Sequence, residues 1–194
     1  MTDLGKWFWI RQPEKFSVVR DGVSIVTEPH TDLWQRTYYG FCNDNAPVFQ
    51  MRTGEKYFSF SVRTRFEPKR RFDQCGIAVY IDGENWLKAS VEYENERFGR
   101  LGSVVTNGGY SDWATTDVPG VVREMYYRLS RRESDFLIEC SENGRDWRQM
   151  RICRLVAADG EIPFGIYACS PEDSSFTAEF SEFALTDCKW NAHE

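Results

Sequence analysis

Four polar side chains of complementary chemistry share one face of a predicted hairpin in the middle of the chain. Residues 74–94 alternate with a period of two, which places successive side chains on opposite sides of a strand. One face is apolar, and the other presents an amide, a phenol, an amine and a carboxylate, from Gln74, Tyr80, Lys88 and Glu92. This set can exchange hydrogen bonds with the hydroxyls of a polar ligand, with Lys88 keeping the carboxylate ionised.

The turn of this hairpin sets which residues face each other. A three-residue turn bracketed by Asp82 and Trp86 predicts the pairs Tyr80 with Lys88, Ala78 with Ser90, and Gly76 with Glu92. The small residues at 76 and 78 would then keep the polar face low enough for a ligand to approach. The alternative is a solvated sheet face on which Lys88 and Glu92 form a surface ion pair worth at most about 1 kcal/mol.

Two other segments combine aromatic rings with polar side chains. The first, residues 31–36, contains Trp34; the second, residues 107–113, is a glycine-containing loop that ends in Asp112 and Trp113. An aromatic ring can stack on the apolar face of a sugar, while carboxylates and amides bind its hydroxyls. These segments are candidate walls of a sugar site. The alternative is that the two tryptophans fill the core beneath loops and Asp112 caps a turn.

A catalytic role for the hairpin would need a second acid. Glu92, Glu94 and Glu96 occupy alternate positions, so their Cα atoms would lie about 6.6–6.8 Å apart along a strand. Retaining glycoside hydrolases use two carboxyl groups about 5–5.5 Å apart, so the spacing permits a hydrolase based on Glu92. We expect Glu94 and Glu96 to be solvated instead, because they run into a turn at residues 97–99.

Composition excludes several classes of function. The 194 residues carry a net charge of -6, with 24 basic and 30 acidic side chains, which argues against a nucleic-acid partner. The basic residues between 63 and 71 are expected to form an ordinary charged strand and turn. Mean hydropathy is -0.55, and no apolar run approaches the ~18 residues of a membrane span. The first residues lack a basic segment followed by an apolar one, so we expect a cytoplasmic protein.

The cysteines give no sign of a metal or redox site. All six lack Cys-x-x-Cys spacing, and only two histidines are available as further ligands. We expect six free thiols, of which Cys75 and Cys140 lie on apolar strand faces. No cofactor is expected, and no carboxylate-dense loop suggests a place for a structural Ca²⁺.

Alternation with a period of two continues through most of the chain, separated by Asp-Gly and Asn-Gly turns. Ten or more short strands predict an all-β fold, a two-sheet antiparallel sandwich, with little helix. A strand near 100–106 would add Gly102 and Val104 to the polar face of the hairpin. The apolar phase shifts by one residue within 176–186, which indicates a β-bulge. No repeat or linker divides the chain, so we expect one domain over residues 1–194.

Several of these segments resemble an uncharacterised domain family that includes the regulation-of-enolase protein. The matching motifs run in order along the chain: TDLW (31–34), FDQCGI (72–77), ENWLKASVE (84–92), VVTNGGYSDW (104–113), SENGRDW (141–147) and GIYACSP (165–171). The resemblance implies a concanavalin A-like lectin/glucanase jelly roll. It does not supply an activity, because one fold can host many functions.

We therefore favour a non-catalytic domain that binds a sugar or another small polar ligand in a groove on one sheet. The expected ligand-binding residues are Trp34, Gln74, Tyr80, Lys88, Glu92, Asp112 and Trp113. The resemblance favours one alternative, an intracellular regulatory domain with a protein partner. A glycoside hydrolase using Glu92 is the other alternative.

Overall fold

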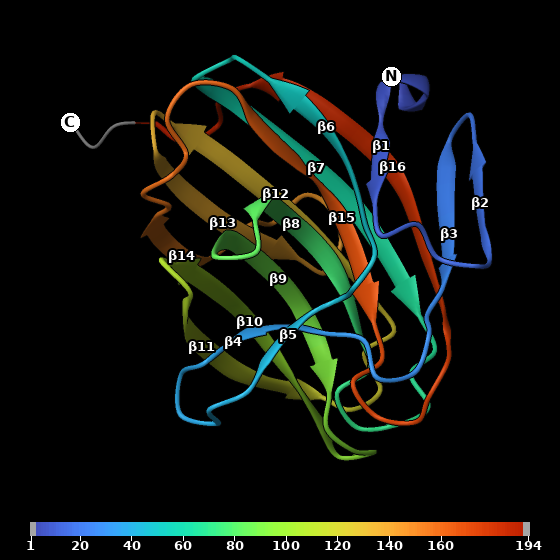
Figure 1. The fold of residues 1–194 in the computed structure, drawn as a ribbon. Coiled ribbons are helices and arrows are strands. Elements are labelled where there is room, and N and C mark those ends of the chain that lie inside the picture. Colours follow the sequence, from blue (N-terminus) through green and yellow to red (C-terminus); the bar gives the residue numbers. More distant parts are fainter. Residues whose placement is uncertain (1–2, 192–194) are drawn as a thin grey trace.

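The computed structural model describes residues 3–191 and confirms the predicted two-sheet sandwich (Figure 1). Each sheet has seven strands, and all neighbouring strands are antiparallel. The first sheet, sheet A, contains in spatial order β1 (Phe8–Ile10), β6 (Val48–Thr53), β15 (Ile162–Cys169), β8 (Gln74–Asp82), β9 (Asn85–Tyr93), β10 (Phe98–Asn107) and β11 (Tyr110–Pro119).

The second sheet, sheet B, packs against the inner face of sheet A. Its strands are, in spatial order, β14 (Arg148–Arg154), β13 (Asp135–Ser141), β12 (Glu124–Arg132), β7 (Tyr57–Phe66), β16 (Thr177–Asp187), β3 (Gly22–Val26) and β2 (Phe16–Val19). The remaining elements are a 3-10 turn, η1 (Leu4–Lys6), and a small two-stranded sheet, β4 (Leu33–Gln35) with β5 (Cys42–Asp44). Within residues 3–191, no helix has the length and hydrophobicity to cross a bilayer.

The core fills the space between the two sheets. The predicted inner face of the β8–β9 hairpin points into this core. Ile77, Val79, Leu87, Ala89 and Val91 are buried there, while Ile81 and Tyr93 are partly exposed. The period-two pattern therefore assigned the two faces correctly, since alternate side chains of a strand must point to opposite sides. All six cysteines are free thiols; Cys75, Cys140 and Cys169 are buried, while Cys42 is exposed.

The predicted register of this hairpin is wrong by two residues. Glu92 lies opposite Gln74, Ser90 opposite Gly76, and Lys88 opposite Ala78. The reason is the turn: Asp82 pairs with Asn85 around the two-residue turn Gly83-Glu84, and a bulge follows Tyr80. The Asp82 carboxylate accepts hydrogen bonds from the Glu84 backbone and the Asn85 amide, which stabilises this tighter turn. An even shift keeps every side chain on its predicted face.

Two other strand predictions have different outcomes. The bulge in the last strand is confirmed, because the pairing of β16 with β7 shifts between Ser181 and Ala184. The loop expected over residues 107–113 is wrong. Only Gly108 and Gly109 form the turn, and Tyr110 begins β11, which pairs with β10 along its whole length. Asp112 and Trp113 are therefore adjacent strand residues on opposite sides of sheet A.

A segment that we call the strap, residues 29–47, crosses the outer face of sheet A and contains β4 and β5 (Figure 1). Apolar side chains beneath it form a second hydrophobic cluster that includes Leu33, Ala46, Ala78, Tyr80 and Trp86. The polar face of the β8–β9 hairpin is thus largely covered, and the solvated sheet face considered as an alternative is excluded. Covering this face creates the walls of a pocket.

Candidate functional site

A pocket of about 360 Å³ lies between the strap and the outer face of β9 and β10. That volume is within the range of small-molecule sites. Its walls carry aromatic rings, from Trp34, Tyr39, Phe41, Phe72 and Trp113. Its polar side chains come from the strap, from strands β8 to β10 and from the loop after β15: Asp32, Gln74, Lys88, Ser90, Glu92, Arg100 and Glu172.

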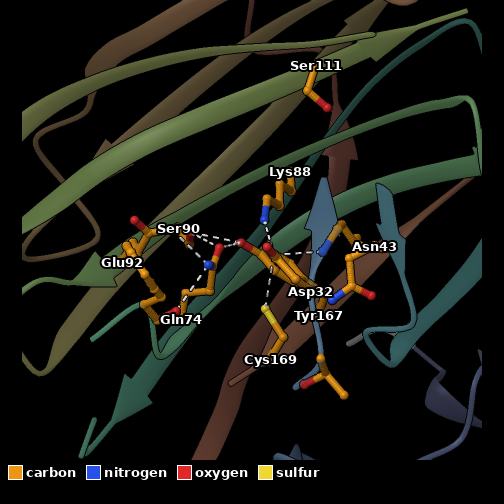
Figure 2. Close-up of polar contacts among 12 residues, drawn as sticks. Asp32, Asn43, Gln74, Lys88, Ser90, Glu92, Ser111, Tyr167 and Cys169 are labelled. Atoms are coloured by element: carbon orange, nitrogen blue, oxygen red, sulfur yellow. Dashed lines mark hydrogen bonds and ion pairs between the residues drawn. The ribbon is translucent and has the colours of Figure 1, made fainter. Parts of the chain in front are cut away.

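The charged part of the pocket is built around Lys88 and Asp32. Lys88 Nζ lies 3.0 Å from Asp32 Oδ1, and both side chains are largely buried. Burial alone would lower the pKa of Lys88, but the combined effect of the neighbouring acidic groups, Asp32 foremost, outweighs burial and the pKa is raised. Lys88 is therefore a permanent cation at neutral pH. Figure 2 shows Lys88 and Cys169 pointing toward Asp32 from two different strands.

Hydrogen bonds to the Asp32 backbone hold this residue in place, in addition to its ion pair with Lys88. Its N–H donates to the Asn45 side chain, and its carbonyl accepts hydrogen bonds from Asn45 and Ala46 on the returning part of the strap. The Cys169 thiol beside it has a pKa well above its ordinary value because it is buried. A neutral buried thiol is a poor nucleophile, so the cluster favours hydrogen bonding over covalent chemistry.

Glu92 is the second acid of the pocket. Gln74 Nε2 donates to Glu92 Oε2 at 2.9 Å, and the Gln74 carbonyl oxygen accepts a hydrogen bond of 2.8 Å from Tyr167 (Figure 2). Tyr167 thereby fixes which way the amide points. Burial raises the pKa of Glu92 to about 7, against the opposing effect of Lys88. Lys88 pairs with Asp32 and does not hold Glu92 fully ionised, so the role expected for Lys88 is corrected.

The aromatic walls come from three separate parts of the chain. The rings of Trp34 and Trp113 are nearly perpendicular, with centroids 6.4 Å apart, and Trp34 also contacts Tyr39. Trp113 leans over β10, where a Cβ at Gly102 would come within 2.8 Å of its indole nitrogen. Glycine at 102 therefore lets this ring lie close to the sheet. Gly102 and Val104 both line the pocket, as predicted from the strand near 100–106.

Strained backbone occurs at Phe72, which lines the pocket, and at three residues of the strap. Phe72, His30, Arg36 and Tyr38 all have positive φ angles, between 56° and 70°. A bulky residue in this conformation is uncommon and is retained only where surrounding contacts hold it. Phe72 is held because its N–H donates to the Tyr93 carbonyl and the next residue, Asp73, binds the backbone of the preceding loop. This places the Phe72 ring at the pocket wall.

The structure brings together some of the predicted site residues and separates others. Five of them line the pocket: Trp34, Gln74, Lys88, Glu92 and Trp113. Tyr80 lies under the strap, where its hydroxyl is 2.7 Å from the Asp44 carboxylate. Asp112 points away from the pocket because it neighbours Trp113 on a strand, and it pairs with Arg151 at 3.1 Å.

The sheet surface at residues 76 and 78, which was predicted to be open to a ligand, is covered by other parts of the protein. Ala78 packs beneath the strap. Tyr167 lies opposite Gly76 on β15, and its hydroxyl reaches Gln74 and Ser90 on the two adjoining strands. A ligand would instead approach Glu92 over Ser90 and Gly102, which line the pocket.

Sequence reasoning missed three charged residues of the site, Asp32, Arg100 and Glu172. Asp32 lies two positions before Trp34 in the segment 31–36, which had been singled out for its aromatic and polar residues. Arg100 occupies β10 and contacts Glu94, which also pairs with Arg71 at 2.6 Å. Glu94 is thus mostly buried in ion pairs, and its expected solvation is wrong. Among residues 3–191, no group of three or more His, Cys, Asp or Glu side chains forms a metal-binding arrangement.

One known protein family matches most of this chain. A family described as "Protein of unknown function (DUF1349)" matches residues 9–188. The chain belongs to the DUF1349 family. The match spans every strand that contributes to the pocket, so the pocket lies within the DUF1349 domain.

Relatives of this DUF1349 protein are known in sequence and in structure. Regulation of enolase protein 1 from Saccharomyces cerevisiae is 32% identical over 185 residues, which cover 95% of this chain and 91% of that protein. The crystal structure of a functionally unknown protein from Saccharomyces cerevisiae has a TM-score of 0.88 and 31% identity, and the match covers 96% of this chain and 98% of that one.

A more distant likeness concerns the fold of the DUF1349 domain. The GH43 protein BlXynB from Bacillus licheniformis matches with a TM-score of 0.73 and 16% identity, over 94% of this chain and 37% of its own. At this identity the likeness extends to the sandwich fold alone.

Proposed function

We propose that this DUF1349 domain binds a carbohydrate in the pocket beneath the strap and does not transform it. The main support for this proposal is the composition of the pocket, which combines aromatic walls with hydrogen-bond donors and acceptors on its polar side. Asp32 and Glu92 supply acceptor oxygens, and Lys88 supplies a donor. Trp34 and Trp113 supply apolar faces on which a sugar ring can stack.

The site is organised before any ligand arrives, which reduces the entropy lost on binding. Asp32 is fastened by Lys88 and by three backbone hydrogen bonds within the strap. Glu92 is oriented by Gln74, which is itself oriented by Tyr167. The GH43 likeness concerns the fold alone, so the proposal depends on the pocket and not on that likeness.

The test is a glycan array followed by calorimetry on each retained sugar. Glu92→Gln and Trp113→Ala should each weaken binding by about tenfold or more, because one removes a carboxyl group that accepts hydrogen bonds and the other a stacking surface. Glu139→Gln and Trp147→Ala are matched controls on and beside sheet B, outside the pocket, and should bind as the wild type does. No retained glycan, or unchanged affinity in Glu92→Gln, would refute the proposal.

Hydrolysis is tested on the same sugars with a reducing-end assay. Glu92 is the acid with the raised pKa, and Asp32 and Glu172 are the other acidic residues that line the pocket. We expect no release of reducing ends. Release that disappears in Glu92→Gln would replace the non-catalytic proposal with a glycoside hydrolase.

A second candidate function follows from the 32% identity to Regulation of enolase protein 1. The domain would then act through a protein partner, and purified enolase is the probe that the relative's name suggests. A stoichiometric complex in size-exclusion chromatography that persists in Glu92→Gln would favour this candidate. Absence of a complex at micromolar concentrations would count against it.

A further inference from the structure

A second hollow of about 490 Å³ adjoins the pocket, and we call it the outer groove. Trp34, Tyr39 and Trp113 line both hollows and form a ridge between them. The outer groove is also lined by Tyr38 and Tyr110, together with the polar residues Thr37, Ser111 and Asp112. The two hollows therefore share one aromatic wall.

The ridge rings contact one another, with Trp34 in the middle. Its ring centroid lies 5.5 Å from that of Tyr39 and 6.4 Å from that of Trp113, at interplanar angles of 69° and 80°. Trp34 is buried, and its indole N–H donates to the Thr37 carbonyl. Trp113 keeps 36% of its surface exposed. A fixed central ring with accessible rings beside it offers stacking surfaces to both hollows.

A closed turn of the strap holds the ring of Tyr38 in solvent. Tyr38 is 92% exposed and has a positive φ of 63°. Its turn is closed by backbone hydrogen bonds in both directions between the two ends, from Arg36 to Phe41 and from Gly40 to Arg36. An aromatic ring presented from a constrained, hydrogen-bonded turn adds nothing to the core, which points to a contact with a ligand.

Arg36 ties this turn to the β10–β11 turn. Its guanidinium donates to the Gly109 carbonyl at 2.8 Å and lies 5.8 Å from the ring centre of Tyr110, which is 64% exposed. Gly109 has a positive φ of 78°, and a Cβ there would collide with the Arg36 guanidinium. The strap and β11 are thus fixed to each other where the outer groove lies between them.

We propose that the ligand is a linear oligosaccharide, with one sugar in the pocket and the next in the outer groove. This inference rests on the proposed function, since it extends the same site across the ridge. The first sugar meets the charged groups of the pocket. The second lies against Tyr38 and Tyr110, where aromatic stacking replaces charged hydrogen bonds. Affinity should therefore increase with chain length.

The test compares two neutral series by calorimetry: D-xylose, xylobiose and xylotriose, and D-glucose, cellobiose and cellotriose. In the series that binds, the disaccharide should bind at least about tenfold more tightly than the monosaccharide, because the second sugar adds stacking surface. Tyr38→Ala and Tyr110→Ala should remove most of this gain and leave monosaccharide affinity unchanged. Both side chains are exposed, so the variants should fold normally. Tyr57→Ala, an exposed tyrosine on sheet B, is the matched control.

The outcomes separate the two proposals. If the monosaccharide binds and loses affinity in Glu92→Gln, but longer chains bind no better, the chain-binding inference is wrong and the proposed function stands. A length-dependent gain that persists in both tyrosine variants would also overturn the inference. Binding of neither series, with no retained glycan on an array, would overturn both proposals.

Discussion

At the scale of single residues, Glu92 and Lys88 respond to burial in different ways because they have different partners. Lys88 has a direct partner in Asp32 at 3.0 Å, so its charge is retained inside the pocket. Glu92 accepts a hydrogen bond from the neutral amide of Gln74, and burial raises its pKa to about 7 from an ordinary value of 4.5. The Glu92 carboxyl therefore changes charge near neutral pH.

This raised pKa predicts how Glu92→Gln changes stability with pH. Between pH 4.5 and about 7, the folded protein binds a proton that the unfolded chain has released, so this group lowers stability as the pH rises. Above pH 7 the charged form is fully present and its burial is fully unfavourable. Glu92→Gln should therefore be more stable than the wild type at pH 8, by about 1–3 kcal/mol, and equally stable near pH 4.5.

Chemical denaturation at several pH values measures this difference. Glu96→Gln, an exposed acid just beyond the same strand, is the control and should change stability at neither pH. A Glu92→Gln variant less stable than the wild type at pH 8 would show that the carboxylate is stabilised in the fold, contrary to the raised pKa.

At the scale of elements, the strap makes the pocket, and polar contacts fasten it at both of its ends. Lys88 binds Asp32 near its beginning, and Tyr80 binds Asp44 near its end. Arg11 adds an ion pair with Asp44 at 3.4 Å and a hydrogen bond to the Tyr80 hydroxyl. Tyr80 therefore contributes to the site by holding the strap, although it does not line the pocket.

Tyr80→Phe should loosen the strap without unfolding the sandwich. Loss of the hydroxyl leaves Asp44 without one buried partner, which should cost about 1–2 kcal/mol. Hydrogen exchange should become faster at strap amides such as Asn45 and Ala46, which donate to Asp32, while the β8–β9 core stays protected. Tyr57→Phe removes a comparable hydroxyl–carboxylate contact at an exposed site and is the control. Unchanged strap exchange in Tyr80→Phe would show that Tyr80 does not hold the strap.

At the scale of the whole molecule, a buried arginine joins three parts of the chain at one end of the sandwich. Arg131 has no exposed surface, and its guanidinium donates to backbone carbonyls of Glu55, Glu133, Ala158 and Gly160. Burial lowers its pKa from the ordinary value, although the group remains a cation. Four carbonyl oxygens, instead of one carboxylate, solvate this charge.

Arg131→Met should strongly destabilise the protein because it removes the donor of these carbonyls, of which Ala158 alone keeps a side-chain donor, the Ser134 hydroxyl. Each buried group left unsatisfied costs about 1–3 kcal/mol, so we expect a total loss of roughly 3–5 kcal/mol after relaxation and water entry. Thermal and urea denaturation measure it. Arg148→Met, which removes an exposed ion pair with Glu142, should change stability by less than about 1 kcal/mol. Equal effects of the two substitutions would refute the structural role of Arg131.

The sequence by itself determined which side of each strand a residue occupies, because that depends only on local alternation. Lys88 and Glu92 share a face, Val91 lies on the other, and the phase shift near Ser181 marks a real bulge. The same rule separates Asp112 from Trp113, but it could be applied only after residues 110–119 were known to be a strand. The glycines at 108 and 109 had suggested a longer loop than the two-residue turn that forms.

Only the tertiary structure decided what meets on that face. Asp32 reaches Lys88 across 56 positions of sequence, because the strap folds back over sheet A. No local pattern encodes that crossing, since it depends on the apolar cluster formed by Leu33, Ala78 and Trp86 from different elements. The same burial raises the pKa of Glu92. Nothing in the sequence around Glu92 predicts this shift, because it arises only when the strap and neighbouring strands exclude water from the carboxylate.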